Sequence, residues 1–176
     1  MRLDEEYREA VISMGKQSLE KVVADNEPFL PKMLIDCGGE LTVATYPQSF
    51  EALTAVADFL IAQGKPVQGI CLTVDTYHLI APKGEEIEDA ERYAGRLEIE
   101  FNNGNPMVCE ALHLNLVTEH HVVTVSIPYV RKPGRKVEWR EALIVDDAEV
   151  EQSIRGRFPD LLREIIRATN TENGDG

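Results

Sequence analysis

Apolar and polar residues alternate along much of the middle of the chain, with the period of two that is typical of β-strands. The longest such stretch is 67–80, in which Ile70 and Leu72 fall on one face of the predicted strand and Asp75 and Tyr77 on the other. Turn residues separate it from shorter stretches of the same kind. These further strands are predicted at 32–36, 40–46, 97–101, 107–117, 122–130 and 137–145.

Helices are predicted where the apolar residues recur at spacings of three and four. The helix before residue 64 is the best defined, because Ser49 is a suitable N-cap and Gly64 a stop signal. Pro159 suits a first helical position and divides the last helical region in two. Helices are expected at 3–25, 49–63, 148–157 and 159–168, and residues 169–176 are expected to form a disordered tail.

Three features of the connections indicate how the strands pair. Gly38 and Gly39 can supply the positive φ angles of a tight turn, which predicts a hairpin between the first two strands. The helix at 49–63 has a length that suits a crossover, so the strand before it and the strand at 67–80 are expected to run parallel. Pro128 has no N–H to donate to a ladder, which predicts an edge position or a bulge there.

The order of elements is helix, two strands, helix, about five strands and helix, which predicts one α+β domain over 1–168. We expect a single, mostly antiparallel twisted sheet of about six to seven strands, with N-terminal, middle and C-terminal helices packed mainly on one face. The 176 residues, of which 43% are apolar, are enough for one sizeable core.

The charge balance narrows the choice of partners. The chain has 31 acidic and 18 basic residues, a formal net charge of -13. Such a surface repels phosphates and anionic membranes, so we expect no direct nucleic-acid binding and no membrane partner. It can attract a basic partner or mimic nucleic acid, although maintaining solubility is the simpler explanation. Mimicry would require one continuous acidic surface that includes Glu85, Glu86, Glu88, Asp89 and Glu91.

Cysteine usage indicates a reducing compartment. Cys37, Cys71 and Cys109 are odd in number and far apart, and no C-x-x-C is present, so we expect reduced structural thiols and a cytoplasmic location. The first residues are acidic and lack the apolar stretch of a secretory signal. No apolar run reaches the ~18 residues that indicate a membrane span.

The common catalytic and cofactor motifs are missing from the sequence. It has no glycine-rich dinucleotide or Walker-type loop, no nucleophile elbow and no H-E-x-x-H pair, so we expect no cofactor. Cys109 and His113 point the same way on one strand, but at ~3.3 Å per residue they stand roughly 13 Å apart, too far to share a zinc ion. A metal site would have to combine residues from several strands, and we expect none.

Asp75, Glu110 and His113 are the candidates for acid–base catalysis. Both carboxylates lie within largely apolar strands, where burial would perturb the pKa and make either one a candidate general base near a histidine. The simpler alternative is that the carboxylates lie on a solvated face of the sheet.

The candidates for binding are an aromatic residue, a histidine and a basic turn. Trp139, the single tryptophan, is either a core residue or an anchor for a partner on an open sheet face. His78 lies near the end of the long strand and is a further contact candidate. The basic turn can dock an acidic group or be a solvated hairpin tip. Its four cations are Arg131, Lys132, Arg135 and Lys136.

The leading hypothesis is a non-enzymatic binding or regulatory module that contacts a protein partner or a second copy of itself. Its contact surface would be an open sheet face around Trp139, Asp75 and His113, or the acidic surface. The first alternative is a small hydrolase that uses Asp75, Glu110 and His113, with or without a divalent metal. Nucleic-acid mimicry is the second alternative.

Overall fold

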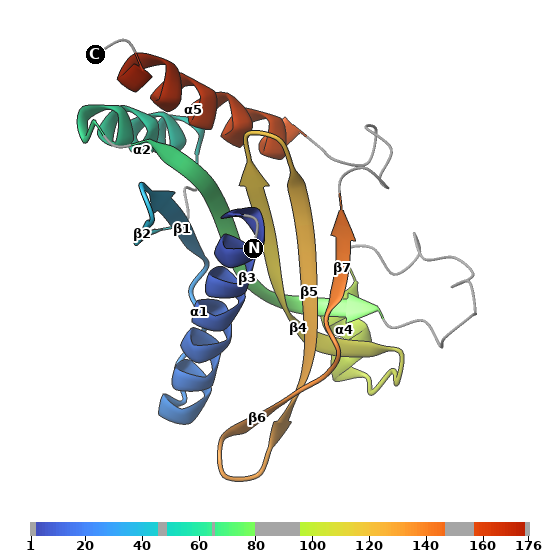
Figure 1. Ribbon diagram of the computed structural model, residues 1–176. Coiled ribbons are helices and arrows are strands. Elements are labelled where there is room, and N and C mark those ends of the chain that lie inside the picture. Colours follow the sequence, from blue (N-terminus) through green and yellow to red (C-terminus); the bar gives the residue numbers. More distant parts are fainter. Residues whose placement is uncertain (1–2, 46–48, 65, 80–95, 147–156, 175–176) are drawn as a thin grey trace.

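The computed structural model describes residues 3–45, 49–64, 66–79, 96–146 and 157–174. Within these ranges the chain forms one curled seven-stranded sheet with helices on both faces (Figure 1). The helices are α1 (Leu3–Asp25), α2 (Phe50–Ala62), α4 (Leu97–Asn102) and α5 (Arg157–Gly174). The strands are β1 (Lys32–Cys37), β2 (Glu40–Thr45), β3 (Val67–Leu79), β4 (Val108–Thr118), β5 (Val122–Lys132), β6 (Lys136–Trp139) and β7 (Leu143–Asp146). The mixed α+β class and the antiparallel sheet are confirmed.

The strand order is β2-β1-β3-β4-β5-β6, and β7 also pairs with β5. β6 pairs with Tyr129–Lys132 and β7 with Val123–Ser126, so the two short strands follow one another along the same edge of β5. Pro128 lies at the gap between them, where its carbonyl accepts the Arg140 N–H at 2.8 Å. Pro128 is therefore neither on an edge strand nor at a bulge in the pairing with β4, but its missing N–H falls where neither short strand pairs with β5.

The first hairpin and the crossover are also confirmed. Gly38 and Gly39 have φ angles of 63° and 87°, and the Gly39 N–H donates to the Asp36 carboxylate at 2.8 Å. β2 and β3 are both antiparallel to β1, so they run parallel to each other with β1 between them. α2 connects them, and the Ser49 hydroxyl accepts the Ala52 N–H at 3.1 Å, as an N-cap does.

Helices cover both faces of the sheet at one end. α2 and α5 pack against each other and over the face that carries Met33 and Ile35, here called the α2/α5 face. α1 packs over the opposite face, which carries Leu34 and Cys71 and is called the α1 face. The expected packing mainly on one face therefore holds for α2 and α5 but not for α1, because the second face also carries apolar residues that need cover.

α1 is held against its face by polar contacts as well as by packing. The buried Tyr7 hydroxyl donates to the Leu34 carbonyl at 3.1 Å. At the other end of the helix, an Arg135 guanidinium N–H donates to the Ala24 carbonyl at 3.3 Å, where helical carbonyls lack partners of their own.

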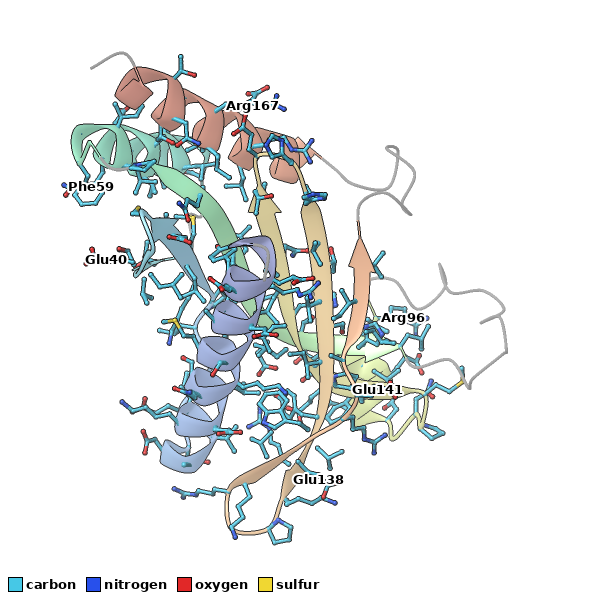
Figure 2. The ribbon with its side chains drawn as sticks, in the orientation of Figure 1. Glu40, Phe59, Arg96, Glu138, Glu141 and Arg167 are labelled. Carbon is cyan, nitrogen blue, oxygen red and sulfur yellow. The ribbon has the colours of Figure 1, made fainter. Side chains whose placement is uncertain are left out.

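On the outer side of the molecule, Phe59 projects from α2 with 57% of its surface exposed (Figure 2).

The strand predicted at 97–101 is wrong, because this segment forms the short helix α4. None of its residues is buried, so no sheet face selects the period of two. Contacts along the helix favour the observed turn instead: Arg96 lies 4.0 Å from Glu100, and Asn105 donates to Glu100 at 3.2 Å. A short alternating segment is thus compatible with either structure.

The C-terminal part also differs from the prediction. The strand expected at 137–145 is divided into β6 and β7. α5 continues to Gly174, beyond the expected boundary at 168; Thr169 is buried, and its hydroxyl donates to the Ile166 carbonyl at 2.8 Å. Most of the helix expected at 148–157 falls outside the described residues.

Candidate functional site

Two carboxylates, a tyrosine and an arginine meet on the α1 face, at the end of the sheet near α4. The Tyr129 hydroxyl donates to Asp75 Oδ1 at 2.8 Å and lies 3.4 Å from Glu110 Oε1. Arg131 Nε donates to Glu110 Oε1 at 2.9 Å, and Arg131 Nη2 lies 3.7 Å from Asp75 Oδ2. We call Asp75, Glu110, Tyr129 and Arg131 the carboxylate–tyrosine cluster.

The strand register brings these residues together. Tyr77 of β3 lies opposite Glu110 of β4, which in turn lies opposite Tyr129 of β5. Asp75 and Arg131 are each two residues from this row, so their side chains point to the same face. The side chains of Asp75 and Glu110 keep only 19% and 14% of their surface exposed, whereas Arg131 keeps 49%.

Burial and neighbouring charges set the protonation of the cluster. Burial, assisted by the nearby Glu110 carboxylate, raises the pKa of Asp75, while the Tyr129 hydrogen bond and Arg131 act in the opposite direction. Burial and the adjacent carboxylates also raise the pKa of Tyr129, which therefore remains a hydrogen-bond donor. The cluster thus combines two carboxyl groups with one guanidinium.

Aromatic rings extend the cluster towards α4. The rings of Tyr77 and Phe101 lie with their centroids 5.0 Å apart. Burial raises the pKa of Tyr77, and the Glu98, Glu110 and Asp75 carboxylates raise it further. The negative potential of the cluster therefore reaches Tyr77 and the first turn of α4.

A cleft of about 460 Å³ opens beside the cluster, between the turn after α4 and the adjoining ends of β4 and β5. Ligand sites in proteins commonly have volumes of about 300–1,000 Å³. Most of the wall is apolar, and Glu110 is the acidic residue in its lining. The lining residues are Phe101, Pro106, Val108, Cys109, Glu110, Tyr129, Val130, Arg131 and Arg140.

The third residue of the expected catalytic set lies on the other side of the sheet. Asp75 and Glu110 share the α1 face, whereas His113 points to the α2/α5 face, opposite Ser126 in the register. His113 lies next to His78 instead, with ring centroids 5.9 Å apart, and His78 Nδ1 is 3.3 Å from the Ser126 hydroxyl. The structure thus brings together two of the three expected residues and separates the third.

Trp139 does not lie on an open sheet face. Its indole N–H donates to Glu20 of α1 at 2.6 Å, and the Lys16 ammonium lies 5.2 Å from the centre of the ring. On its other side it meets the edge of Tyr129 at a centroid distance of 5.5 Å. The contact surface expected around Trp139, Asp75 and His113 is therefore not one surface, because α1 contacts Trp139 and His113 faces the other way.

The cations of the basic turn contact the protein itself. Arg131 belongs to the carboxylate–tyrosine cluster, and Arg135 donates to the end of α1. Lys132 lies 3.1 Å from Glu138 on the facing strand β6, at the end of the hairpin (Figure 2). Lys136 is exposed at the start of β6. Three of the four cations thus contact another residue of the protein, which weakens the docking hypothesis for this turn.

The remaining candidates are the cysteines, the acidic segment and a metal site. Cys37, Cys71 and Cys109 are all buried, and none of the three forms a disulfide bond in the structure. The acidic residues between 85 and 91, on which the mimicry hypothesis depends, lie outside the described residues. In the described ranges, no three His, Cys, Asp or Glu side chains converge as a metal site would require.

Sequence reasoning missed the two tyrosines and Phe101 as parts of the site. Tyr129 ends a run of alternating apolar residues on β5, and such a tyrosine presents a polar hydroxyl where the apolar face stops. That pattern was a usable signal. Phe101 has no such signal, because the alternating pattern of its segment predicts a strand, whereas the segment forms α4.

None of the helices in the described part of the chain is long and apolar enough to cross a membrane. Comparisons with protein-family models, with curated proteins and with solved structures found no match to this chain.

Proposed function

We propose that this protein is a non-enzymatic binding module that receives a basic side chain of a protein partner in the cleft beside the carboxylate–tyrosine cluster. The observation that carries the proposal is the Glu110 carboxylate in the wall of a mostly apolar cleft, close to the second carboxyl group of Asp75; Arg131 and Arg140 in the same wall oppose it. Lysine and arginine have long apolar stems and charged ends, so such walls suit the stem and such a cluster suits the end.

The charge of the whole molecule supports the same kind of partner. With a formal net charge of -13, the protein attracts basic surfaces over distances of about a Debye length, ~8–10 Å at physiological salt. Long-range attraction accelerates the encounter, and the cleft then provides the specific contact. The same charge disfavours nucleic acid as the partner.

The geometry gives less support to the hydrolase alternative. Its proposed histidine, His113, faces away from Asp75 and Glu110 across the sheet. Both carboxylates are engaged by Arg131 and by the Tyr129 hydroxyl, so neither is poised to take a proton from a bound water. The positions of Asp75 and Glu110 therefore support binding of a charged group better than they support acid–base catalysis.

Arg140 allows a test of whether the ligand is basic or acidic. It lines the cleft and is exposed, so its positive charge opposes a basic ligand and would favour an acidic one. Replacement of Glu110 should weaken the binding of a basic probe, whereas replacement of Arg140 should strengthen it. An acidic ligand would reverse both effects.

The experiment measures binding of a short arginine- and lysine-containing peptide by calorimetry and by amide chemical shifts. We expect Glu110→Gln to weaken binding about tenfold, equivalent to ~1.4 kcal/mol, and Arg140→Gln to strengthen it. Glu9→Gln on the exposed side of α1 is the control with the same change in net charge, and it should have little effect. Equal weakening by Glu9→Gln and Glu110→Gln would reduce the interaction to non-specific attraction and overturn the proposal.

We also propose that the protein works in a reducing compartment such as the cytoplasm. None of its three cysteines forms a disulfide bond and all three are buried, which suits an environment that keeps thiols reduced. Mass measurement of the protein purified without reductant, with and without a thiol-blocking reagent under denaturing conditions, tests this: three blocked thiols are expected, and an intermolecular disulfide would contradict it.

A further inference from the structure

The second polar site of the sheet lies on the α2/α5 face, beyond the part that α2 and α5 cover. His78 of β3 and His113 of β4 are both half-buried there, and their rings lie 5.9 Å apart between centroids at an interplanar angle of 52°. The Ser126 hydroxyl lies 3.3 Å from His78 Nδ1 and is itself only 4% exposed. The cleft and the carboxylate–tyrosine cluster make no use of these residues.

We propose that His78 and His113 form a two-histidine binding site for a late first-row transition metal ion such as Zn²⁺. Imidazole nitrogen is a preferred ligand of these ions. With ion–nitrogen distances of about 2.0–2.1 Å, two imidazoles that share one ion have ring centres roughly 5 to 6.5 Å apart. The observed separation of 5.9 Å falls in that range without any movement of the backbone.

Ser126 gives His78 the orientation that a metal ligand needs. A ligating histidine commonly makes a hydrogen bond through its other ring nitrogen, which fixes the tautomer and the direction of the ring. When His78 Nδ1 carries the proton, it donates to the Ser126 hydroxyl and leaves the Nε2 lone pair available. Ser126 lies opposite His113 in the register of β4 and β5, so it is adjacent to the second histidine of the site as well.

Two protein ligands leave coordination positions open. Among the described residues no third His, Cys, Asp or Glu side chain completes the site, so water or a donor atom of a bound molecule would occupy the remaining positions. Cys109, which lies opposite His78 in the register, is a buried thiol whose pKa is raised mainly by that burial. The site therefore resembles an open, exchangeable centre more than a closed structural one, and we expect micromolar rather than tighter affinity.

The test titrates Zn²⁺ into metal-free wild-type protein and follows the histidine ring resonances by NMR, with the dissociation constant measured by a competing chromophoric chelator. We expect the His78 and His113 ring signals to shift together and to saturate at one equivalent. His78→Gln and His113→Gln should each weaken binding at this site at least tenfold. Ser126→Ala should weaken it several-fold while both histidines remain in place.

The control is the pair of exposed histidines at the tip between β4 and β5. His120 and His121 are adjacent in sequence, so a double variant with Gln at both positions removes the same number of imidazoles without touching the proposed site. This variant should bind Zn²⁺ as the wild type does. If the His78 and His113 signals stay unchanged at millimolar Zn²⁺ in the wild type, the site does not exist, and that measurement requires no variant to fold.

Discussion

The close approach of Gly69 to Tyr7 allows the placement of α1 on the sheet to be tested by one methyl group. A Cβ added to Gly69 of β3 would lie 2.5 Å from Tyr7 Cε1, 2.9 Å from Cδ1 and 3.0 Å from Cζ. Real Cβ atoms are essentially never found so close to another atom. In Gly69→Ala, therefore, the buried Tyr7 ring or the whole first part of α1 has to move.

The expected cost follows from what that movement breaks. Overpacking a buried site costs about 1–3 kcal/mol, and loss of the Tyr7 hydrogen bond to the buried Leu34 carbonyl costs about 1–2 kcal/mol more. The backbone adds no penalty, because Gly69 does not have the positive φ that disfavours alanine. We expect Gly69→Ala to lower the free energy of unfolding by about 2–5 kcal/mol.

The assay is urea-induced unfolding of four proteins: wild type, Gly69→Ala, Tyr7→Ala and the double variant. Because Tyr7→Ala removes the ring, the alanine at position 69 should then cost little, and the coupling energy of the cycle should be about 2 kcal/mol. Gly15→Ala is the control within α1: its Cβ would lie 3.1 Å from Leu112 Cδ2 and 3.4 Å from Leu114 Cδ2, which these side-chain ends can accommodate by small shifts, and alanine improves helix propensity by about 1 kcal/mol. A coupling energy below ~0.5 kcal/mol would show that the helix does not pack against β3 in this way.

Three further predictions concern the site and the core. Tyr129→Phe should lower the free energy of unfolding by about 1–2 kcal/mol and raise the pKa of Asp75 further, because it removes a hydrogen bond to the carboxylate; carboxyl NMR titration measures the shift, and an unchanged Asp75 pKa would contradict the contact. The folded-state pKa of Asp75 lies above its unfolded value, so its contribution to stability is fully present below the unfolded pKa and is lost as pH rises through the folded one. Relative to Asp75→Asn, the wild type should thus become less stable as the pH rises above about 4, and urea unfolding that gave the opposite slope would refute this assignment. The three buried thiols should resist a water-soluble disulfide reagent in the folded protein and react with three equivalents in denaturant; fast reaction in the folded state would exclude their burial.

Much of the fold follows from patterns within single segments. α1 and α2 have the apolar spacing of helices over many residues, and the cap at Ser49 and the glycine pair at 38 and 39 specify local geometry directly. The two faces of β3 were also assigned correctly, because alternation within one strand fixes which residues share a face. The short helix α4 was not predictable in this way, because few residues and few contacts decide between a helix and a strand there.

The candidate site required information that no single segment contains. Glu110 and His113 are three residues apart on one regular strand, so the sequence already places them on opposite faces, and a catalytic set with both on one face could have been excluded. Which of the two joins Asp75 depends on the register between β3 and β4, where a slip of one residue would exchange them. The register is set by the packing of the apolar half of the sheet, far from the polar residues that it positions.

The half-buried polar residues at the uncovered end of the sheet are the strongest reason to expect a function there. Burial raises the pKa of Asp75 and lowers those of His78 and His113, which means that the ionised form of each group is disfavoured where it lies. Apolar residues at the same positions would extend the two cores and make the sheet more stable. Groups that are costly to the fold and lie near a cleft or near one another are typical of sites maintained for binding or chemistry. This cost falls on both faces of the same strands, β3 and β4, so Glu110→Gln and His113→Gln should separate the two roles: each should remove only the binding assigned to its own face.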